Sequence, residues 1–297
     1  MNDAELSRLR REIDAIDDAL HDSIMRRTSL ADQVRLAKGG GAPTFRPGRE
    51  IQILRRLVER HEGRFPKAVL VRIWREIISA TLGLQGPFSV AAHASENAPA
   101  CYDLAREHFG YATSIIAHQS TRAVVHAIGE GAATVGVLPV PEDNEDDSWW
   151  PALSAYPTPG PSIVARIPVA PVAEIHGQTP EALVIATISN EETGDDRSFI
   201  MIQASSGVSR ARLSGALSQV ELETVSMITR PDDGDPELTQ FLFEVDGYVV
   251  DGDPRLAALM GSEELSIEVA EVLGGYGIPF RSTDIASGRS VQGENGR

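Results

Sequence analysis

The sequence of 297 residues is short of several features that mark particular classes of protein. It contains a single cysteine, Cys101, so no disulfide can form within the chain. No apolar run is long enough to cross a bilayer, and the N-terminal residues lack the apolar core of a secretion signal. We therefore expect a cytoplasmic protein without a membrane segment.

Positive charge and the common cofactor motifs are scarce as well. Lys and Arg number 27 against 43 Asp and Glu, which gives a formal net charge of −16. Nucleic acids and anionic membrane surfaces bind clustered cations, so this balance argues against both as partners. The sequence shows no metal-ligand spacing, phosphate-binding loop, dinucleotide fingerprint or nucleophile elbow, and we expect neither a metal nor a cofactor. The first 85 residues hold most of the arginines, which favours an anionic small molecule there.

A stretch without proline or glycine runs from residue 6 to residue 38 and predicts one long amphipathic helix. Its apolar residues recur at steps of three and four, with one longer step: Leu6, Leu9, Ile13, Ile16, Leu20, Ile24, Leu30 and Val34. Arg27 and Lys38 fall on this apolar stripe, and Arg10 lies beside it. A buried charge is costly unless it is paired, so these cations need either an internal carboxylate or an anionic ligand.

The length of this helix constrains how its cations can cooperate. At the usual helical rise, Arg10 and Arg27 lie about 25 Å apart, whereas Arg27 and Lys38 are about 16 Å apart and can converge on one small molecule. Arg10 can share that site only if it comes from a second, antiparallel copy of the helix. A helix of about 50 Å also exceeds the core that some 85 residues can build. We therefore expect an intertwined homodimer with shared sites.

Two shorter helices are predicted to follow. Three glycines end the first helix, Pro47 opens a second, and Pro66 precedes a third whose expected stripe runs through Leu70, Ile73, Trp74, Ile77, Thr81 and then Leu84 or Gln85. Thr81 and Gln85 are four residues apart, which places them on one side of the third helix. Polar residues at inward positions of three helices predict a binding site inside an all-α bundle.

Residues 1–86 resemble the all-helical class of chorismate mutase, as found at the N-terminus of bifunctional chorismate mutase/prephenate dehydratase proteins. The matching pieces are LRREIDAID, the MRR that ends in Arg27, the LAK that ends in Lys38, the RPxRE box and REIISATLGLQ. The resemblance implies rearrangement of chorismate to prephenate, an isomerase reaction of phenylalanine and tyrosine biosynthesis in the shikimate pathway. It also implies the site residues: Arg10 of one subunit with Arg27 and Lys38 of the other hold the two carboxylates, Lys38 and Gln85 donate to the ether oxygen, Glu50 contacts the ring hydroxyl, and Thr81 helps to seat the ring carboxylate.

This chemistry needs neither a nucleophile nor a metal, because the pericyclic step is unimolecular and leaves negative charge on the ether oxygen. Catalysis then consists of holding the reactive conformer and stabilising that charge. Gln85 carries no titratable proton, so we expect a flat rate profile from about pH 6 to 9. One departure is that some family members carry an arginine and a glutamate where this chain has Ile53 and Leu54.

Residues 87–186 alternate strand and helix patterns and predict an open α/β region. This region resembles the first half of a prephenate dehydratase domain, whose GVVPxEN-like motif corresponds to the run from Gly136 to Asp143. The glycine-rich turn of that family is replaced by the residues from His93 to Asn97, its Thr-Arg-Phe motif is missing before Leu183, and about half the usual length is absent. We expect a truncated region that has lost dehydratase activity.

Residues 187–281 show the order strand, helix, strand, strand, helix, strand of the α+β ferredoxin-like split pattern. They are similar to an ACT domain, which senses amino acids in prephenate dehydratases. The effector loops of that family correspond to Gly207–Arg210 and Ile228–Pro231, where Arg210 replaces a small residue and a glutamate is lost, so an amino-acid effector is a doubtful partner. Residues 282–297 lack both period and apolar content and predict a disordered tail.

Four functions remain open from the sequence. The leading one is a monofunctional chorismate mutase with degenerate regions behind it. The others are a bifunctional chorismate mutase/prephenate dehydratase, an isochorismate-pyruvate lyase that uses the same helical fold, and a non-catalytic regulatory protein that binds an amino acid through the ACT-like region.

Overall fold

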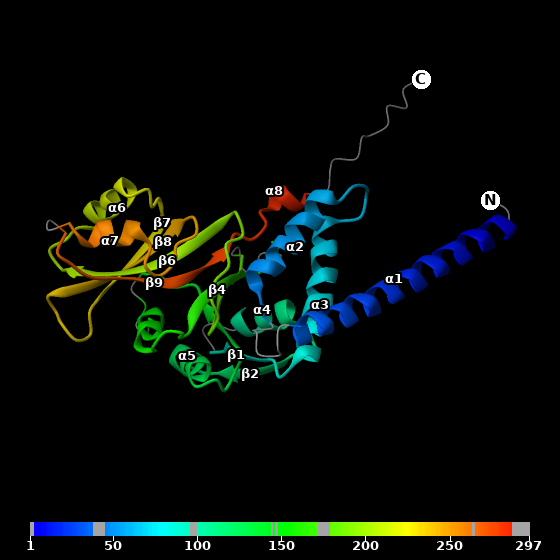
Figure 1. Ribbon diagram of the computed structural model, residues 1–297, viewed down its shortest axis with the longest axis horizontal. Helices are drawn as coiled ribbons and strands as arrows, with labels where there is room; N and C mark the ends of the chain where they lie inside the picture. The colour runs from blue at the N-terminus through cyan, green and yellow to red at the C-terminus, as the bar shows by residue number, and fades with distance from the viewer. Residues whose placement is uncertain are drawn as a thin grey trace, which may run out of the picture.

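The computed structural model describes residues 3–37, 45–95, 100–143, 145, 148–171, 179–262 and 265–286. The chain begins with the three expected helices, α1 (Asp3–Ala37), α2 (Pro47–Arg60) and α3 (Lys67–Gln85). α1 reaches away from the rest of the chain, and only its C-terminal part approaches α3 (Figure 1). No residue of α1 is buried, so its apolar stripe faces solvent in the single chain.

Within the described ranges, the strands after these helices form a nine-stranded sheet with the order β2-β1-β3-β5-β4-β9-β6-β8-β7. Its first half consists of β1 (Ser89–His93), β2 (Ser114–His118), β3 (Val135–Pro139), β4 (Ser162–Ile167) and β5 (Ala182–Ala186). β1 pairs in parallel with β2 and β3, whereas β5 is antiparallel to both β3 and β4. The intervening helices are α4 (Ala100–Phe109), α5 (Thr121–Gly129) and the 3-10 helix η1 (Trp150–Ala155). This is the α/β arrangement that the sequence predicts after the helices.

The second half of the sheet contains the split pattern of strands and helices. Its elements are β6 (Asp196–Ser205), α6 (Arg210–Gln219), β7 (Thr224–Pro231), β8 (Leu238–Asp246), α7 (Pro254–Met260) and β9 (Ile267–Gly277). β6 lies between β9 and β8, with antiparallel pairing throughout. α6 and α7 lie together over one face of these strands (Figure 1). The order β9-β6-β8-β7 is that of a ferredoxin-like fold.

The two halves of the sheet meet where β4 pairs in parallel with β9, through Ile163 and Gly274. Gly274 has φ +116, and a Cβ there would stand 2.1 Å from the carbonyl oxygen of Ile163. Only glycine fits this approach, since any side chain would collide with the neighbouring backbone. The sequence predicts a domain boundary near residue 186, and the strands on either side of that boundary share one sheet.

The apolar core follows the alternation of the strands. Val90 and Ala92 pack with α4 on one face of the sheet, whereas Ala91 packs with α5 on the other. A third cluster lies between α6, α7 and the strands β6 and β8. Trp149 and Trp150 are fully buried in the α5 cluster, where the indole of Trp149 donates to the Pro139 carbonyl at 3.0 Å. Sequence patterns do not reveal this role, because the pair follows a polar, acidic stretch.

The end of the chain departs from expectation. Ser282–Ile285 form a short helix, α8, so the predicted disordered tail is wrong for its first residues, and residues 287–297 lie outside the described part. A hydrogen bond from the backbone of Arg281 to the carboxylate of Asp284 caps this helix at 2.7 Å. None of the helices in the described ranges combines the length and apolar character needed to span a membrane.

Candidate active site

Arg27 of α1 contacts the third helix, α3. Its side chain is half-buried against α3, and its Nη1 donates to the hydroxyl of Thr81 at 3.2 Å. Thr81 in turn donates to the carbonyl of Ile77 at 2.7 Å, which fixes the rotamer of the hydroxyl. Burial lowers the pKa of Arg27, and the nearby negative charge of Glu50 opposes that shift. Three different helices therefore bring polar side chains close together: Arg27 of α1, Glu50 of α2 and Thr81 of α3.

Glu50 enters this site from the first turn of α2. Pro47 begins the helix, and a carboxylate in the first turn is favoured by the helix dipole. The residue is only 7% exposed and forms an ion pair with Arg75 of α3. The other Nη of Arg75 donates to the carbonyl of His108, at the end of α4, at 2.9 Å. The position of Glu50 is thus set by α3 and, through Arg75, by the α/β region.

Sequence reasoning missed Arg75. The buried side of α3 runs Val71, Arg75, Ile78 and Leu82, at steps of four, three and four, and this spacing was the available signal. The expected stripe of α3 is accordingly wrong at Ile73 and Leu84, which are exposed in the single chain. α3 has apolar residues on two faces, and only one of them meets α2 and α4.

Among the described residues, the predicted site residues Arg10 and Gln85 form no hydrogen bond with this group in the single chain. Gln85 is the last residue of α3 and is half-buried. Arg10 is exposed, on the part of α1 that extends away from the bundle (Figure 1). Lys38 lies outside the described residues. Leu54 is buried between α2 and α3 with Val58 and Val71, so it is a core residue.

Helix α2 is anchored to the sheet on the side away from α3. Arg46, at its start, pairs with Glu191, and Gln52 donates to the carbonyl of Glu192 at 3.2 Å. Arg55 donates to the carbonyls of Asp195 and Ile278 at 2.8 and 2.9 Å, and to the Thr193 hydroxyl at 2.9 Å. These contacts hold the Glu50 helix against the turn between β5 and β6.

The two expected effector loops of the ferredoxin-like half are joined by an internal carboxylate. Asp143, which ends the run that starts at Gly136, accepts two hydrogen bonds from Arg210 at 3.0 and 3.1 Å. It also accepts one from the backbone of Thr229 at 3.0 Å. The Arg210 hydrogen bond is the main reason that the pKa of Asp143 lies below its usual value. In the single chain, these loops therefore bind a carboxylate of the same chain, that of Asp143.

Comparison with known proteins bears first on the helical segment. Residues 9–86 match the family model of chorismate mutase type II. The bifunctional chorismate mutase/prephenate dehydratase of Pseudomonas aeruginosa is 31% identical over 147 residues, which cover 48% of this chain and 40% of that protein. The alignment is longer than the helical segment, so it extends into the α/β region. The chain thus spans well under half the length of this curated relative.

Solved structures align with about two thirds of the chain. A structure described as GqqA, a novel type of quorum quenching acylases, aligns with 68% of this chain and all of its own, with a TM-score of 0.50 and 15% identity. Prephenate dehydratase from Streptococcus mutans aligns with 65% of this chain and 99% of its own, with a TM-score of 0.46 and 12% identity. At such identities a likeness concerns the fold alone. The sequence match is the more specific finding, and it makes the N-terminal segment, residues 9–86, similar to the chorismate mutase type II family.

Proposed function

We propose that this protein is a chorismate mutase, an isomerase that rearranges chorismate to prephenate. The observation that carries the proposal is the meeting of Arg27, Thr81 and Glu50 inside a segment that matches the chorismate mutase type II family. In the proposed site, Arg27 and Lys38 bind the carboxylates of chorismate, Thr81 helps to seat the ring carboxylate, and Glu50 accepts a hydrogen bond from the ring hydroxyl.

The chemical step requires stabilisation of one oxygen. As the C–O bond of the ether breaks, negative charge develops on its oxygen, and Lys38 and Gln85 donate hydrogen bonds to it. Fixed donors aimed at a developing charge are worth most where water is excluded, and one such donor typically contributes about 2.7 to 4 kcal/mol. The cations also hold the two carboxylates in the reactive geometry, which lowers the entropic part of the barrier.

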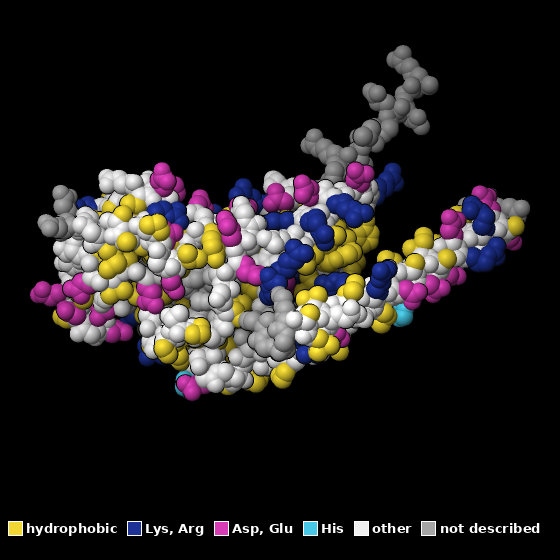
Figure 2. Space-filling model, in the orientation of Figure 1, with side chains coloured by type: hydrophobic (Ala, Val, Ile, Leu, Met, Phe, Trp, Pro, Cys, Tyr) yellow, Lys and Arg dark blue, Asp and Glu magenta, His cyan; other side chains and the backbone are white. Residues whose placement is uncertain are grey.

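We infer that the active form is a homodimer in which Arg10 of a second copy completes the site. Support comes from the exposed apolar side chains along α1, where Ile13, Ile16 and Leu20 are each at least 55% exposed. Figure 2 shows apolar side chains along α1 and over α3. Contiguous apolar surface of this kind marks a protein interface in soluble proteins. An antiparallel second α1 would cover it and would bring Arg10 to the Arg27 end of the partner.

We also propose that the chain lacks prephenate dehydratase activity. The Thr-Arg-Phe motif of that family is missing at the start of β5, where Glu181 instead forms an ion pair with Arg166 at 2.6 Å. The carboxylate of Asp143 is engaged by the ferredoxin-like half and is not presented to a separate cleft. The proposed reaction therefore ends at prephenate.

A single assay series tests both proposals. The purified chain is incubated with chorismate and the products are identified, with the variants Arg27→Ala and Arg26→Ala in parallel. Arg26 is exposed on the same helix and serves as the matched control. We expect prephenate from the unmodified chain and from Arg26→Ala, and a loss of at least about 100-fold in kcat/KM for Arg27→Ala. Equal rates for the two variants would remove Arg27 from the site, and phenylpyruvate as product would restore the bifunctional alternative.

A further inference from the structure

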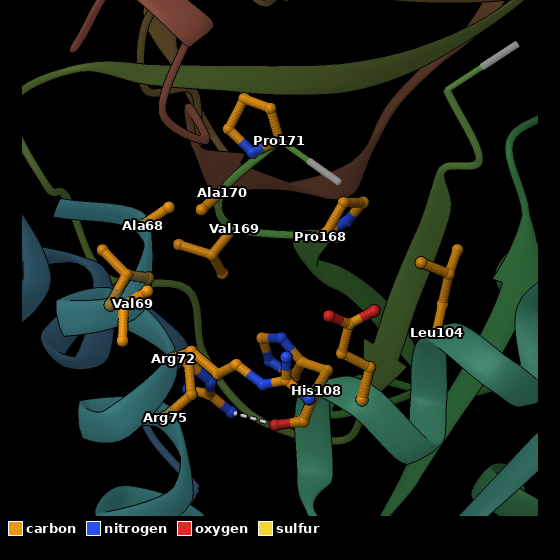
Figure 3. A pocket seen from close by; sticks show the side chains of 12 residues that line it. Ala68, Val69, Arg72, Arg75, Leu104, His108, Pro168, Val169, Ala170 and Pro171 are labelled. Atoms are coloured by element: carbon orange, nitrogen blue, oxygen red, sulfur yellow. Dashed lines mark hydrogen bonds between the residues drawn. The ribbon is translucent and has the colours of Figure 1, made fainter. Parts of the chain in front are cut away.

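A cavity of about 310 Å³ lies between the helical segment and the α/β region. One wall is α3, the opposite wall is α4, and the segment after β4, from Pro168 to Pro171, lies across the top (Figure 3). Its volume is at the lower end of the range typical of small-molecule sites. Arg75 lines this cavity, whereas Arg27, Glu50 and Thr81 of the proposed mutase site do not.

The cavity has an apolar body. Val69 of α3 and Leu104 of α4 lie on opposite sides of the space, with Val169 on the segment above (Figure 3), and Val71 also lines it. Val71 and Leu104 are buried members of the core clusters on either side, so these walls are fixed by packing. Such a lining favours a ligand with a compact apolar group.

The floor of the cavity carries no net charge. Arg75 is buried there and is neutralised by its ion pair with Glu50. His108 is also buried, and burial together with the positive charge of Arg75 holds its pKa well below the usual value, so the imidazole is neutral. Within the described part of the chain, no group hydrogen-bonds the His108 ring, which leaves it available as a neutral polar contact for a ligand.

The mouth of the cavity carries one charge of each sign. Arg72 of α3 and Glu107 of α4 both line it, and both side chains are exposed. Neither forms an ion pair with any described residue. A guanidinium pairs well with a carboxylate, and a glutamate pairs with an ammonium group. The two walls together therefore match a small molecule that bears both groups.

We propose that this cavity binds an α-amino acid with a large apolar side chain. The carboxylate of the amino acid pairs with Arg72 and its ammonium group with Glu107, while the side chain enters between Leu104, Val69 and Val169. A purely anionic ligand would place a negative charge close to Glu107. A purely cationic ligand would place a positive charge close to Arg72. Binding here depends neither on mutase activity nor on the loops at Arg210 and Thr229.

Isothermal titration calorimetry of the full chain tests the proposal, with L-phenylalanine and L-leucine as probes and 3-phenylpropanoate and 2-phenylethylamine as analogues that lack one charge. We expect saturable binding of at least one amino acid, and binding at least about tenfold weaker for each analogue of phenylalanine. No binding of either amino acid, or equal binding of the analogues, overturns the proposal.

Variants locate the site. Arg72→Met and Glu107→Gln are exposed changes that should leave the circular dichroism spectrum unchanged and weaken amino-acid binding at least about tenfold. Arg64→Met and Asp103→Asn remove matching charges at exposed positions that do not line the cavity, and they should bind like the unmodified chain. If Arg210→Met abolishes binding while Arg72→Met does not, the amino acid occupies the ferredoxin-like half and the proposal is wrong.

Discussion

Replacement of Arg75 by methionine tests how the buried carboxylate of the site is held. The change removes the guanidinium but keeps an unbranched, flexible side chain, so Glu50 is left without its ion-pair partner where its side chain is only 9% exposed. The carbonyl of His108 keeps a donor, because Ser79 Oγ also bonds it at 3.2 Å. The main cause of lost stability is therefore the unpaired charge of Glu50. Breaking a buried ion pair in this way costs about 3 to 5 kcal/mol.

The assay is urea denaturation followed by circular dichroism, in which the first unfolding transition reports the free energy of unfolding. We expect Arg75→Met to lower this free energy by about 3 to 5 kcal/mol. Arg72→Met, three residues earlier on the exposed side of α3, should change it by no more than about 0.5 kcal/mol. This control separates the effect of breaking the buried ion pair from any general effect of a methionine on the helix.

A second substitution identifies the cause of the loss. Adding Glu50→Gln to Arg75→Met removes the unpaired charge, so the double variant should regain a large part of the lost stability. The coupling between the two positions then exceeds about 1 kcal/mol, as expected for residues in direct contact. A cost below about 1 kcal/mol for Arg75→Met, or two strictly additive changes, would refute the reasoning that Glu50 depends on this partner.

Further predictions concern pH and assembly. Because Gln85 holds no titratable proton, kcat should stay level between about pH 6 and 9, and a steep fall at neutral pH would contradict its role. Ile16→Asp places a charge on the exposed stripe of α1 and should convert dimers to monomers in sedimentation experiments, whereas Asp18→Lys on the opposite face should not; unchanged dimers in both would locate the interface elsewhere. His108 has a depressed pKa in the folded chain, so only the unfolded chain takes up its proton below about pH 6.5, and stability should fall there by up to about 1.4 kcal/mol per pH unit. His108→Asn should remove that slope in urea titrations at several pH values, and an unchanged slope would contradict a buried neutral imidazole.

The elements of this fold could be predicted from the sequence because their signals are local. The apolar spacing from Leu6 to Val34, the proline at residue 47 and the alternation around Phe199 each act within a few residues. The helices and strands accordingly lie close to their predicted positions. The join between β4 and β9 could not be found in this way, because it depends on Gly274 meeting Ile163, which is more than a hundred residues away.

The candidate site was predictable only in part, for the same reason. The family resemblance implied Arg27, Glu50 and Thr81 as site residues, and the structure brings these three side chains close together. Arg75 was missed because an arginine within an apolar helix is recognised as an ion-pair partner only once α2 is packed beside α3. The predicted positions of Arg10 and Lys38 in the site stay predictions, since one depends on a second copy of the chain and the other lies outside the described residues.

The contacts of α2 explain why the helical segment and the sheet are best understood together. One side of α2 carries Glu50, whose partner Arg75 is itself held by the carbonyl of His108 in the α/β region. The other side carries Arg55, which donates to backbone carbonyls both before β6 and after β9. A carboxylate that is proposed to bind a substrate hydroxyl gains precision when its helix is fixed at both sides, because hydrogen bonds around a functional residue set its geometry. The part of the chain that follows the helical segment therefore contributes to the candidate site by positioning Glu50 through Arg75.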